Sequence, residues 1–324
     1  MKVRITRKFE VARNISAFEL ADPVGASLPA FSAGAHIDVH LGHGLIRQYS
    51  LCNSPGEQHR YLIGVLLEPA SRGGSTAMHG LPEGTLIEIG EPKNHFPLSH
   101  DATHSILLAG GIGVTPILCM AERLAHTGAS FELHYCTREP ERAAFRERFD
   151  EPHLKGHTRL YFDNAPLAER IDLSKVLSDP EPGKHLYVCG PGGFIEAVLD
   201  HARQRGWNSA NVHREYFTAA PASGNADADG PFQVKLAKSG RIVDVGAGQT
   251  VVKALDEAGV MVATSCEEGV CGTCLTRVLS GEPDHRDVYL TEDERRANDQ
   301  FLPCCSRSKS PMLVLDLQEP GIRV

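Results

Sequence analysis

The sequence has no hydrophobic run long enough to cross a lipid bilayer. Its longest apolar stretch, ILLAGGIGVTPILCMA, is interrupted by three glycines and a proline, whereas a membrane-spanning helix needs about 20 apolar residues. The first residues, MKVRITRKFEVARNI, contain neither an apolar core segment nor a small-residue cleavage site, so no signal peptide is predicted. We therefore expect a cytoplasmic protein with no membrane partner.

The chain also has no excess of positive charge. Its 33 lysines and arginines stand against 41 aspartates and glutamates, which gives a formal net charge of −8. Nucleic-acid-binding domains usually carry a basic patch, and no segment here supplies one, so nucleic acid is not an expected partner. The hydrophobic content of 41% is that of a globular protein, and 324 residues predict two or three domains.

Cysteine is present in an odd number, nine, which fits a disulfide framework poorly. Cys266, Cys271 and Cys274 are crowded into SCEEGVCGTC, and 29 residues separate them from Cys304 in LPCCSRSKS. Structural zinc sites usually offer two separate ligand pairs. The spacing C-x4-C-x2-C with a distant fourth cysteine is instead the plant-type ferredoxin pattern, in which four thiolates hold a [2Fe–2S] cluster. Cys305 is a competing fourth ligand, which the spacing disfavours.

The residues around these cysteines predict a small β-rich domain at 231–324. FQVKLAKSGRIVDV has two alternating segments around a Ser-Gly turn, which indicates a hairpin. QTVVKALDEAG is typical of a short amphipathic helix, and LTRVLSGE and MLVLDL of further strands. Hairpins, a crossing helix and a long ligand loop resemble the β-grasp ferredoxin fold, which is α+β. A linker of small and polar residues, 222–230, is expected before this domain.

The middle of the chain, 101–221, has the pattern of a parallel α/β domain. SILLAGGIGVTPILCMAERLAHTGASFELHYCTRE predicts a strand, a glycine-rich turn, an amphipathic helix and a second strand, which is a βαβ unit. The turn AGGIGVTP lacks the third glycine of the dinucleotide fingerprint, so by itself it is equally compatible with a structural turn. A second glycine turn, in LYVCGPGGFIEAVLDHA, follows another apolar strand. Two such turns at strand ends favour a ligand site there.

The first 100 residues predict an antiparallel β-barrel. Short strand-like segments, including AHIDVHL, IRQYSLC, YLIGVLLE and TLIEIGEP, are separated by glycine and proline turns. Within this region, SRGGS offers a cation and a glycine-rich backbone that could cradle a phosphate. Read alone, RQYS and SRGGS are more simply explained as an ordinary strand and a surface turn.

Six motifs, RQYSL, RGGS, GGIGVTP, CGP, CEEGVCGTC and GEPDHRD, occur in this order along nearly the whole chain. In this combination the sequence resembles the phthalate dioxygenase reductase family, which includes vanillate demethylase reductases, within the ferredoxin–NADP reductase superfamily. The resemblance implies a monomeric oxidoreductase with FMN, NADH and a [2Fe–2S] cluster that passes electrons to a Rieske-type oxygenase. Rival functions are a general flavin diaphorase without a dedicated oxygenase and a redox-sensing regulator.

The resemblance also implies which residues form the sites. Hydride transfer would involve Ser50, Thr115, Cys189 and Glu215. FMN would be held by Arg47, Gln48, Tyr49, Ser50, Arg72, Gly73, Gly74, Ser75 and Phe217. The nicotinamide nucleotide would be held by Gly110, Gly111, Gly113, Thr115, Arg138, Cys189, Gly190 and Pro191. The cluster ligands would be Cys266, Cys271, Cys274 and Cys304.

Two choices between related cofactors depend on particular residues. FMN is favoured over FAD because RGGS suits a terminal phosphate and no aromatic-rich insertion clearly offers a face for an adenine. NADH is favoured over NADPH because a 2′-phosphate needs a cluster of cations. In CTREPERAAF, Arg138 and Arg142 alternate with Glu139 and Glu141, and such mixed charge is a poor phosphate clamp.

Overall fold

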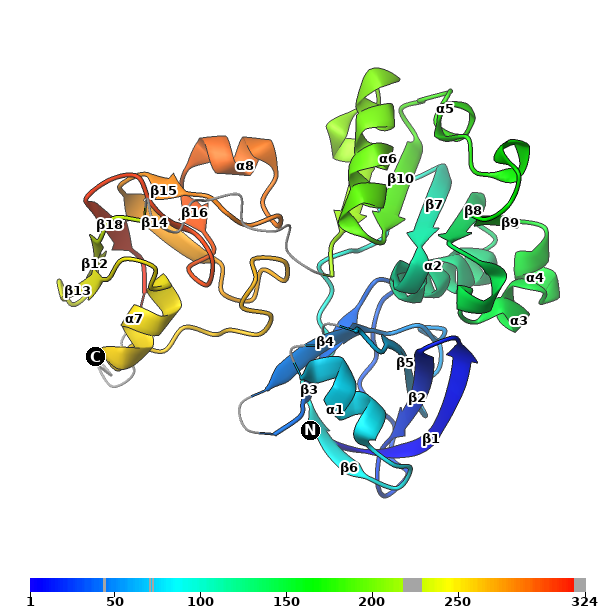
Figure 1. Cartoon of the computed structure of the whole chain (residues 1–324), viewed down its shortest axis with the longest axis horizontal. Coiled ribbons are helices and arrows are strands. Elements are labelled where there is room, and N and C mark those ends of the chain that lie inside the picture. The colour runs from blue at the N-terminus through cyan, green and yellow to red at the C-terminus, as the bar shows by residue number, and fades with distance from the viewer. Residues whose placement is uncertain (43–44, 70, 72, 218–228, 318–324) are drawn as a thin grey trace. The chain divides into compact units, whose positions relative to one another are not determined.

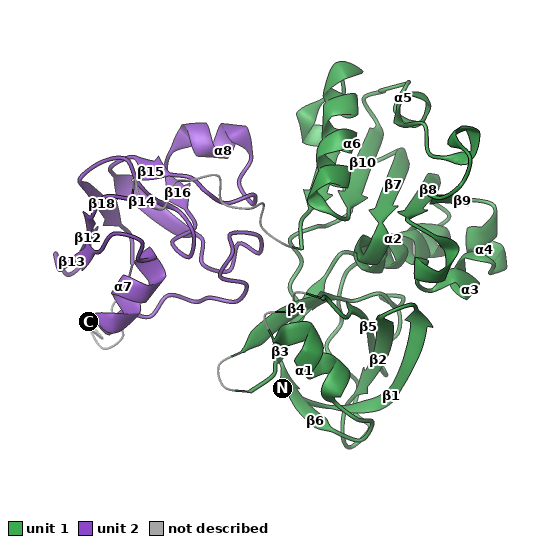
Figure 2. Ribbon diagram, in the orientation of Figure 1, with its two compact units in different colours: residues 1–217 green, residues 218–324 purple. Residues whose placement is uncertain are grey.

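The computed structural model describes residues 1–42, 45–69, 71, 73–217 and 229–317, and the chain divides into two compact units (Figure 1, Figure 2). Unit 1 contains residues 1–217 and unit 2 contains residues 218–324. Most of the linker expected at 222–230 lies outside the described residues, since only its last two positions belong to them.

The first half of unit 1 is an antiparallel barrel. Its strands are β1 Lys2–Ala12, β2 Ile15–Ala21, β3 His36–His40, β4 Ile46–Ser50, β5 Tyr61–Leu66 and β6 Leu86–Ile89, and the helix α1, Gly74–Gly80, connects β5 to β6. The order in the sheet is β4-β3-β6-β1-β2-β5, and all pairings are antiparallel. An additional bridge joins Leu51, just after β4, to Ile63 in β5, so the two ends of the sheet meet. Alternate residues of the strands point inward and form the barrel core.

The second half of unit 1 is a parallel α/β domain. Its strands are β7 His104–Gly110, β8 Phe131–Thr137, β9 Thr158–Phe162, β10 Lys184–Cys189 and β11 Val212–Glu215. They lie parallel in the order β11-β10-β7-β8-β9. The direction in which the chain adds strands therefore changes between β7 and β10, and open α/β sheets bind ligands at such a switch point.

Helices cover both faces of this parallel sheet (Figure 1). The helix α2, Val114–Thr127, packs on one face and α6, Gly192–Gln204, packs on the other, because alternate residues of β7 point to opposite sides. The shorter helical segments are α3 Arg146–Phe149, α4 Pro152–Lys155, α5 Leu173–Val176, η1 Gly111–Gly113, η2 Pro140–Arg142, η3 Leu167–Glu169 and η4 Ser209–Asn211.

A hydrophobic cluster crosses the boundary between the barrel and the parallel sheet. It joins Leu62 and Phe96 of the barrel half to α2 and to Phe145. The guanidinium of Arg148 adds polar contacts, donating to the carbonyl oxygen of Cys52 at 2.6 Å and to a carboxylate oxygen on α2 at 2.6 Å. These shared contacts explain why residues 1–217 form one unit, although the sequence suggested separate domains at 1–100 and 101–221.

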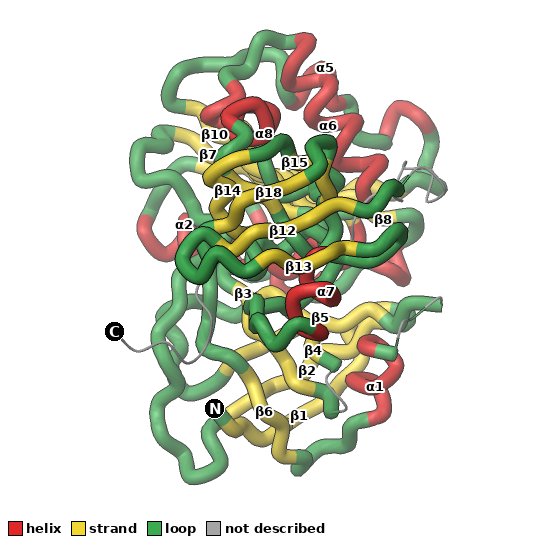
Figure 3. Tube along the Cα trace, turned by 90° about the vertical axis from the view of Figure 1, so that its left-hand side faces the viewer, coloured by secondary structure: helices red, strands yellow, loops and turns green. Residues whose placement is uncertain are grey.

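Unit 2 is a mixed sheet with a helix packed on it. The strands are β12 Phe232–Leu236, β13 Ile242–Val245, β14 Thr276–Ser280, β16 Gln300–Phe301 and β18 Met312–Leu315, in the order β13-β12-β18-β14-β16. Figure 3 shows β13, β12, β18 and β14 side by side. Among these strands of the described part of unit 2, only β12 and β18 pair in parallel. The helix α7, Val251–Glu257, buries its apolar side in the core of this unit. A small second sheet pairs β15 Pro283–Asp284 with β17 Arg307–Ser308, and α8, Glu292–Ala297, starts at a capping box formed by Thr291 and Glu294.

The fold class expected from the sequence is confirmed. The chain has an antiparallel barrel, a parallel α/β domain and a small mixed α+β domain. Among the helices formed by the described residues, none is long and apolar enough to span a membrane.

Candidate functional site

The first candidate site lies where β4 meets the start of α1. Arg47 is half-buried on β4, and its guanidinium donates to the carbonyl oxygen of Ile46 at 2.8 Å. The side chain of Arg47 crosses Gly74, since a Cβ atom on this glycine would lie 2.6 Å from Arg47 Cγ and 2.7 Å from Nε. Gly73 has a φ of 92°, a left-handed conformation that suits glycine. RQYS and RGGS are thus adjacent in the fold, which places a cation beside the first backbone N–H groups of a helix.

Two other residues expected at the FMN site use their side chains within the protein. Gln48 lies beside Asp38 of β3, and its amide donates to Asp38 Oδ1 at 3.0 Å. The hydroxyl of Ser75 accepts a hydrogen bond from the backbone N–H of Glu68 at 3.1 Å. Neither side chain is therefore available to a flavin without giving up this contact.

The aromatic and hydroxyl residues expected near the flavin ring lie at the ends of strands. Tyr49 is half-buried against the barrel core, and Ser50 is buried at the end of β4. Phe217 is 36% exposed and is the last described residue of unit 1. Arg72 lies outside the described residues.

The two glycine turns of the parallel sheet are in direct contact. A Cβ atom on Gly113 would lie 2.4 Å from the carbonyl group of Cys189 and 2.6 Å from the backbone nitrogen of Gly190. A Cβ atom on Gly110 would lie 2.9 Å from Pro191 Cδ. Only glycine lets the ends of β7 and β10 approach so closely. The starts of α2 and α6 therefore face the same edge of the sheet, at the switch point where a nucleotide would be expected.

Gly111 differs from its neighbours in this turn, because it faces open space. Its φ is 53°, and no atom lies within 4 Å of the position that a Cβ would occupy. The left-handed backbone, and not crowding, favours glycine at this position.

Thr115 lies at the junction of the barrel and the parallel sheet. It is 1% exposed, and its hydroxyl donates to the carbonyl oxygen of Ile112 at 3.1 Å. Its methyl carbon lies 2.9 Å from the position of a Cβ on Gly64 in β5. The residue thus reaches the barrel, and its hydroxyl is engaged in its own helical turn.

Cys189 and Glu215 end two neighbouring parallel strands, β10 and β11, and are paired in register. Their Sγ and Oε2 atoms lie 4.0 Å apart. Burial raises the pKa of Glu215 from 4.5 to about 8, so this carboxyl is largely protonated at neutral pH. Burial, together with the nearby Glu215, raises the pKa of Cys189 well above 9.0. The pair therefore presents a neutral acid and a neutral thiol at the sheet edge.

A cluster of charges surrounds Glu139 just beyond the end of β8. Its carboxylate oxygen Oε1 lies 2.5 Å from Arg13 Nη1, which comes from the β1–β2 turn, and 2.9 Å from Arg142 Nε. Arg138 is exposed beside this group. Glu139, one of the two acids that alternate with arginines in CTREPERAAF, is thus already paired with two arginines.

The four cysteines expected to hold the cluster are arranged as two pairs in unit 2. The thiols of Cys266 and Cys271 are hydrogen-bonded to each other, and the thiol of Cys304 is within hydrogen-bonding reach of both Cys274 and Cys305. The hydrogen bond from Cys271 and those from backbone N–H groups outweigh burial and lower the pKa of Cys266 to about 7. Donors that stabilise a thiolate are what a cluster ligand needs.

Two glycines let the ligand loop fold closely against the segment 287–289. Gly269 has a φ of 74°, and its Cβ position would be 2.4 Å from Cys305 Sγ. Gly272 has a φ of 71°, and its Cβ position would be 2.4 Å from the ring of Tyr289. Side chains at either position would push the ligands away from one another, so the spacing of SCEEGVCGTC depends on both glycines.

The four cysteines can supply the ligands of a two-iron cluster. Within the described residues, no group of three or more His, Cys, Asp or Glu side chains converges on a site for one metal ion. A [2Fe–2S] cluster instead takes four cysteine thiolates, which the two pairs can supply. The alternative ligand, Cys305, is only partly buried, and its thiol lies beside that of Cys304 and 3.7 Å from the carbonyl oxygen of Leu302.

Sequence reasoning missed several residues that shape these sites. Arg13 acts on Glu139 from 126 positions away, and nothing in the β1–β2 turn marks it out. The ring of Phe194 packs against Gly110 and Gly190. Its position directly after CGPGG was the one available signal. Tyr289 could not be found from the cysteine spacing, because its contact with the ligand loop is tertiary.

Two family models match the chain. The 2Fe-2S iron-sulfur cluster binding domain covers residues 234–309, and the N-terminal domain of dimethylamine monooxygenase subunit DmmA-like proteins covers residues 92–212. The first therefore spans the ligand loop, and the second spans both glycine turns of the parallel sheet.

Full-length relatives are also similar. The chain is 54% identical to a vanillate O-demethylase oxidoreductase of Pseudomonas putida, over 97% of this chain and 98% of that one. It is 47% identical to a protein of the same name from Acinetobacter baylyi, over 98% and 99%. The solved structure of a phthalate dioxygenase reductase, described as modular for electron transfer from pyridine nucleotides to [2Fe–2S], is 40% identical with a TM-score of 0.73 and covers 98% of each chain.

Proposed function

This chain belongs to the family of phthalate dioxygenase reductases and vanillate O-demethylase reductases, and we propose that it serves a Rieske-type oxygenase that demethylates a methoxylated aromatic acid. At the coarser level it is an NADH-dependent reductase component of an oxygenase system, with FMN and a [2Fe–2S] cluster as cofactors. The observation that carries the finer proposal is the 47–54% identity to the vanillate enzymes over nearly the full length.

The number of electrons that each cofactor gives or accepts determines its role. NADH gives up two electrons as a hydride, a [2Fe–2S] cluster accepts one at a time, and a flavin can do both. The protein's task is to bind and orient these groups. In the proposed assignment, Arg47 and the Gly73–Ser75 turn hold the flavin phosphate, the turns at Gly111–Gly113 and Gly190–Pro191 hold the nucleotide, and the two cysteine pairs hold the cluster.

Glu215 and Cys189 would sit beside the reacting ring. Because burial keeps Glu215 protonated at neutral pH, its carboxyl can donate a hydrogen bond at Oε without adding a negative charge. In the proposed assignment, the buried neutral thiol of Cys189 on the neighbouring strand and the buried hydroxyl of Ser50 in the barrel would also belong to this site.

We also propose that the protein acts as a monomer in the cytoplasm. None of the nine cysteines, all of which lie in the described residues, forms a disulfide, which suits a reducing compartment.

Reconstitution with a demethylase oxygenase tests the function. The expected reaction consumes one methoxylated acid, one O₂, one NADH and one proton, and yields the phenol, formaldehyde, water and NAD⁺. Vanillate should give formaldehyde in proportion to the NADH oxidised. A phthalate-type oxygenase supplied as the alternative acceptor should turn over more slowly. Faster turnover with the phthalate-type oxygenase would contradict the demethylase assignment while leaving the reductase chemistry intact.

A further inference from the structure

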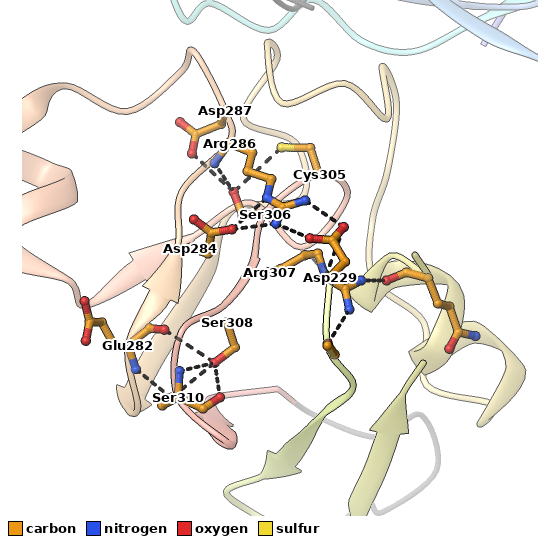
Figure 4. A network of polar contacts seen from close by, with 12 residues as sticks. Asp229, Glu282, Asp284, Arg286, Asp287, Cys305, Ser306, Arg307, Ser308 and Ser310 are labelled. Carbon is orange, nitrogen blue, oxygen red and sulfur yellow. Dashed lines mark hydrogen bonds and ion pairs between the residues drawn. The ribbon is translucent and has the colours of Figure 1, made fainter. Parts of the chain in front are cut away.

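The motif GEPDHRD, residues 281–287, has no place in the function described so far. It follows β14 and contains β15, and in the fold it lies against the turn that carries Cys304. Figure 4 shows a network of polar side chains there, in which the hydroxyl of Ser306 lies between Asp287 and the backbone of Arg286, while the Arg286 side chain points to Asp229. A buried polar network is costly unless its members are satisfied, so its contacts are informative.

Asp287 is the most deeply buried charge of this network, with a side chain that is 0% exposed. One carboxylate oxygen, Oδ2, accepts from the backbone N–H of Leu290 at 2.8 Å. The other, Oδ1, lies 3.4 Å from the hydroxyl of Ser306, two residues after the fourth proposed ligand. Ser306 is itself fully buried and accepts from the backbone N–H of Arg286 at 3.1 Å. Asp287 therefore ties the motif to the turn that carries Cys304.

The same residue also contacts the ligand loop on its other side. The Cα and Cβ atoms of Asp287 lie 2.9 Å from the position that a Cβ on Gly269 would occupy, between Cys266 and Cys271. The next residue, Val288, donates its backbone N–H to the carbonyl oxygen of Gly269 at 3.1 Å. Asp287 thus lies between the two segments that supply cluster ligands, with its carboxylate against Ser306 and its Cα and Cβ atoms against Gly269.

The negative charge of Asp287 is only partly balanced. The closest cation is Arg295, whose Nη2 lies 3.8 Å from Oδ2 and whose side chain is 34% exposed to solvent. The imidazole of His285 lies 3.8 Å from Oδ1, and burial lowers its pKa, so it is neutral at pH 7. Arg286 turns instead to Asp229 and Asp284.

We propose that Asp287 is a positioning residue for the cluster, which holds the two ligand segments in register and lowers the reduction potential through its buried charge. Reduction adds an electron to the cluster, and a nearby carboxylate opposes that addition. The proposal rests on the four cysteines holding a [2Fe–2S] cluster, and it is independent of which oxygenase accepts the electrons.

The test compares two isosteric substitutions in the full-length holoprotein. Asp287→Asn removes the charge and keeps an acceptor for Leu290, and Asp284→Asn removes an equal charge three residues earlier, at a side chain that is 31% exposed. Redox titration followed by EPR should show a more positive cluster midpoint potential in Asp287→Asn and little change in Asp284→Asn. Iron and sulfide content, and flavin reduction by NADH, should stay at the wild-type level.

Two results would overturn the proposal. One is a wild-type potential and EPR spectrum in Asp287→Asn, and the other is an equal shift in Asp284→Asn. If Asp287→Asn fails to retain iron, the same redox titration and EPR measurement on Ser306→Ala tests the proposal. Altered g values of its reduced cluster would support the positioning role, since the tie to the Cys304 turn is lost, whereas unchanged g values and potential would refute it.

Discussion

Replacing Glu215 with glutamine should remove a carboxyl whose ionised form the fold disfavours. Burial raises the pKa of Glu215 from 4.5 to about 8, so the folded state holds the proton more tightly than the unfolded chain does. The contribution of Glu215 to the free energy of unfolding is therefore fully present below pH 4.5 and is lost progressively as the pH rises to about 8. At 1.36 kcal/mol per pKa unit the whole shift is worth about 5 kcal/mol. Because Glu215 is only partly buried by its exposed area, we expect it to contribute about 2–3 kcal/mol to the free energy of unfolding.

Two measurements on the full chain check this value. Urea unfolding of unit 1 at pH 5 and pH 9 should show a loss of stability in the wild type that Glu215→Gln lacks, and the exposed Glu141→Gln should behave as the wild type does. The rate of flavin reduction by NADH should fall above about pH 8 in the wild type, and glutamine should flatten this profile because it still donates a hydrogen bond. Parallel pH dependence of wild type and Glu215→Gln in both assays would show that the carboxyl ionises normally.

Two further substitutions address the flavin and the cluster. Gly74→Ala should displace Arg47 and weaken FMN binding by about 10- to 100-fold, which corresponds to the loss of one charge-assisted hydrogen bond. Gly80→Ala, in the same helix, should leave FMN binding unchanged, because a Cβ there meets no atom within 4 Å. Fluorescence titration of the apoprotein with FMN measures both affinities, and equal affinities would contradict the phosphate site. Cys304→Ser should lose iron and Cys305→Ser should keep it in iron and sulfide analysis, and a full cluster in Cys304→Ser would mean that the wrong fourth ligand was chosen.

The folds of all three parts could be predicted because their signals are local. Alternation in AHIDVHL, the strand–turn–helix pattern around Gly110 and the crowding of Cys266, Cys271 and Cys274 each lie within a short window of sequence. The glycine turns were located in the same way. Parallel strands bring their carboxyl ends to one edge of the sheet, so the sequence predicts that the two turns lie near each other. The close approach of Gly113 to Cys189 depends on the packing of the sheet and could not be predicted.

The rest depends on contacts between distant residues. Glu139 looked like a free acid in CTREPERAAF, and only the fold places Arg13 on it. Gln48 belonged to the flavin motif, yet the strand pairing of β3 with β4 directs its amide to Asp38. Asp287 was one acid among many in a charged segment, and its burial follows from the close contact with Gly269. The hydrophobic periodicity of the sequence carries no information on such contacts between distant residues.

The pairing of Glu139 changes the physical reason for expecting NADH. A 2′-phosphate would not be repelled chiefly by this acid, since Arg13 and Arg142 already balance its charge. The carboxylate instead occupies two arginines that could otherwise bind a phosphate. Glu139→Gln should release them, and one gained charge-assisted contact would raise kcat/KM for NADPH by about 10- to 100-fold.

The loss of stability in Glu139→Gln should be small, because the pairs are partly exposed and such pairs contribute about 0–1 kcal/mol. Stopped-flow reduction of the flavin by each nucleotide measures the effect, and the exposed Glu141→Gln serves as the charge-matched control. NADH should still be used by both variants. If removal of either acid improved NADPH use equally, the effect would be general charge repulsion, as the bare sequence suggests. If neither removal improved it, the nucleotide's adenosine end would lie elsewhere than the turn after β8.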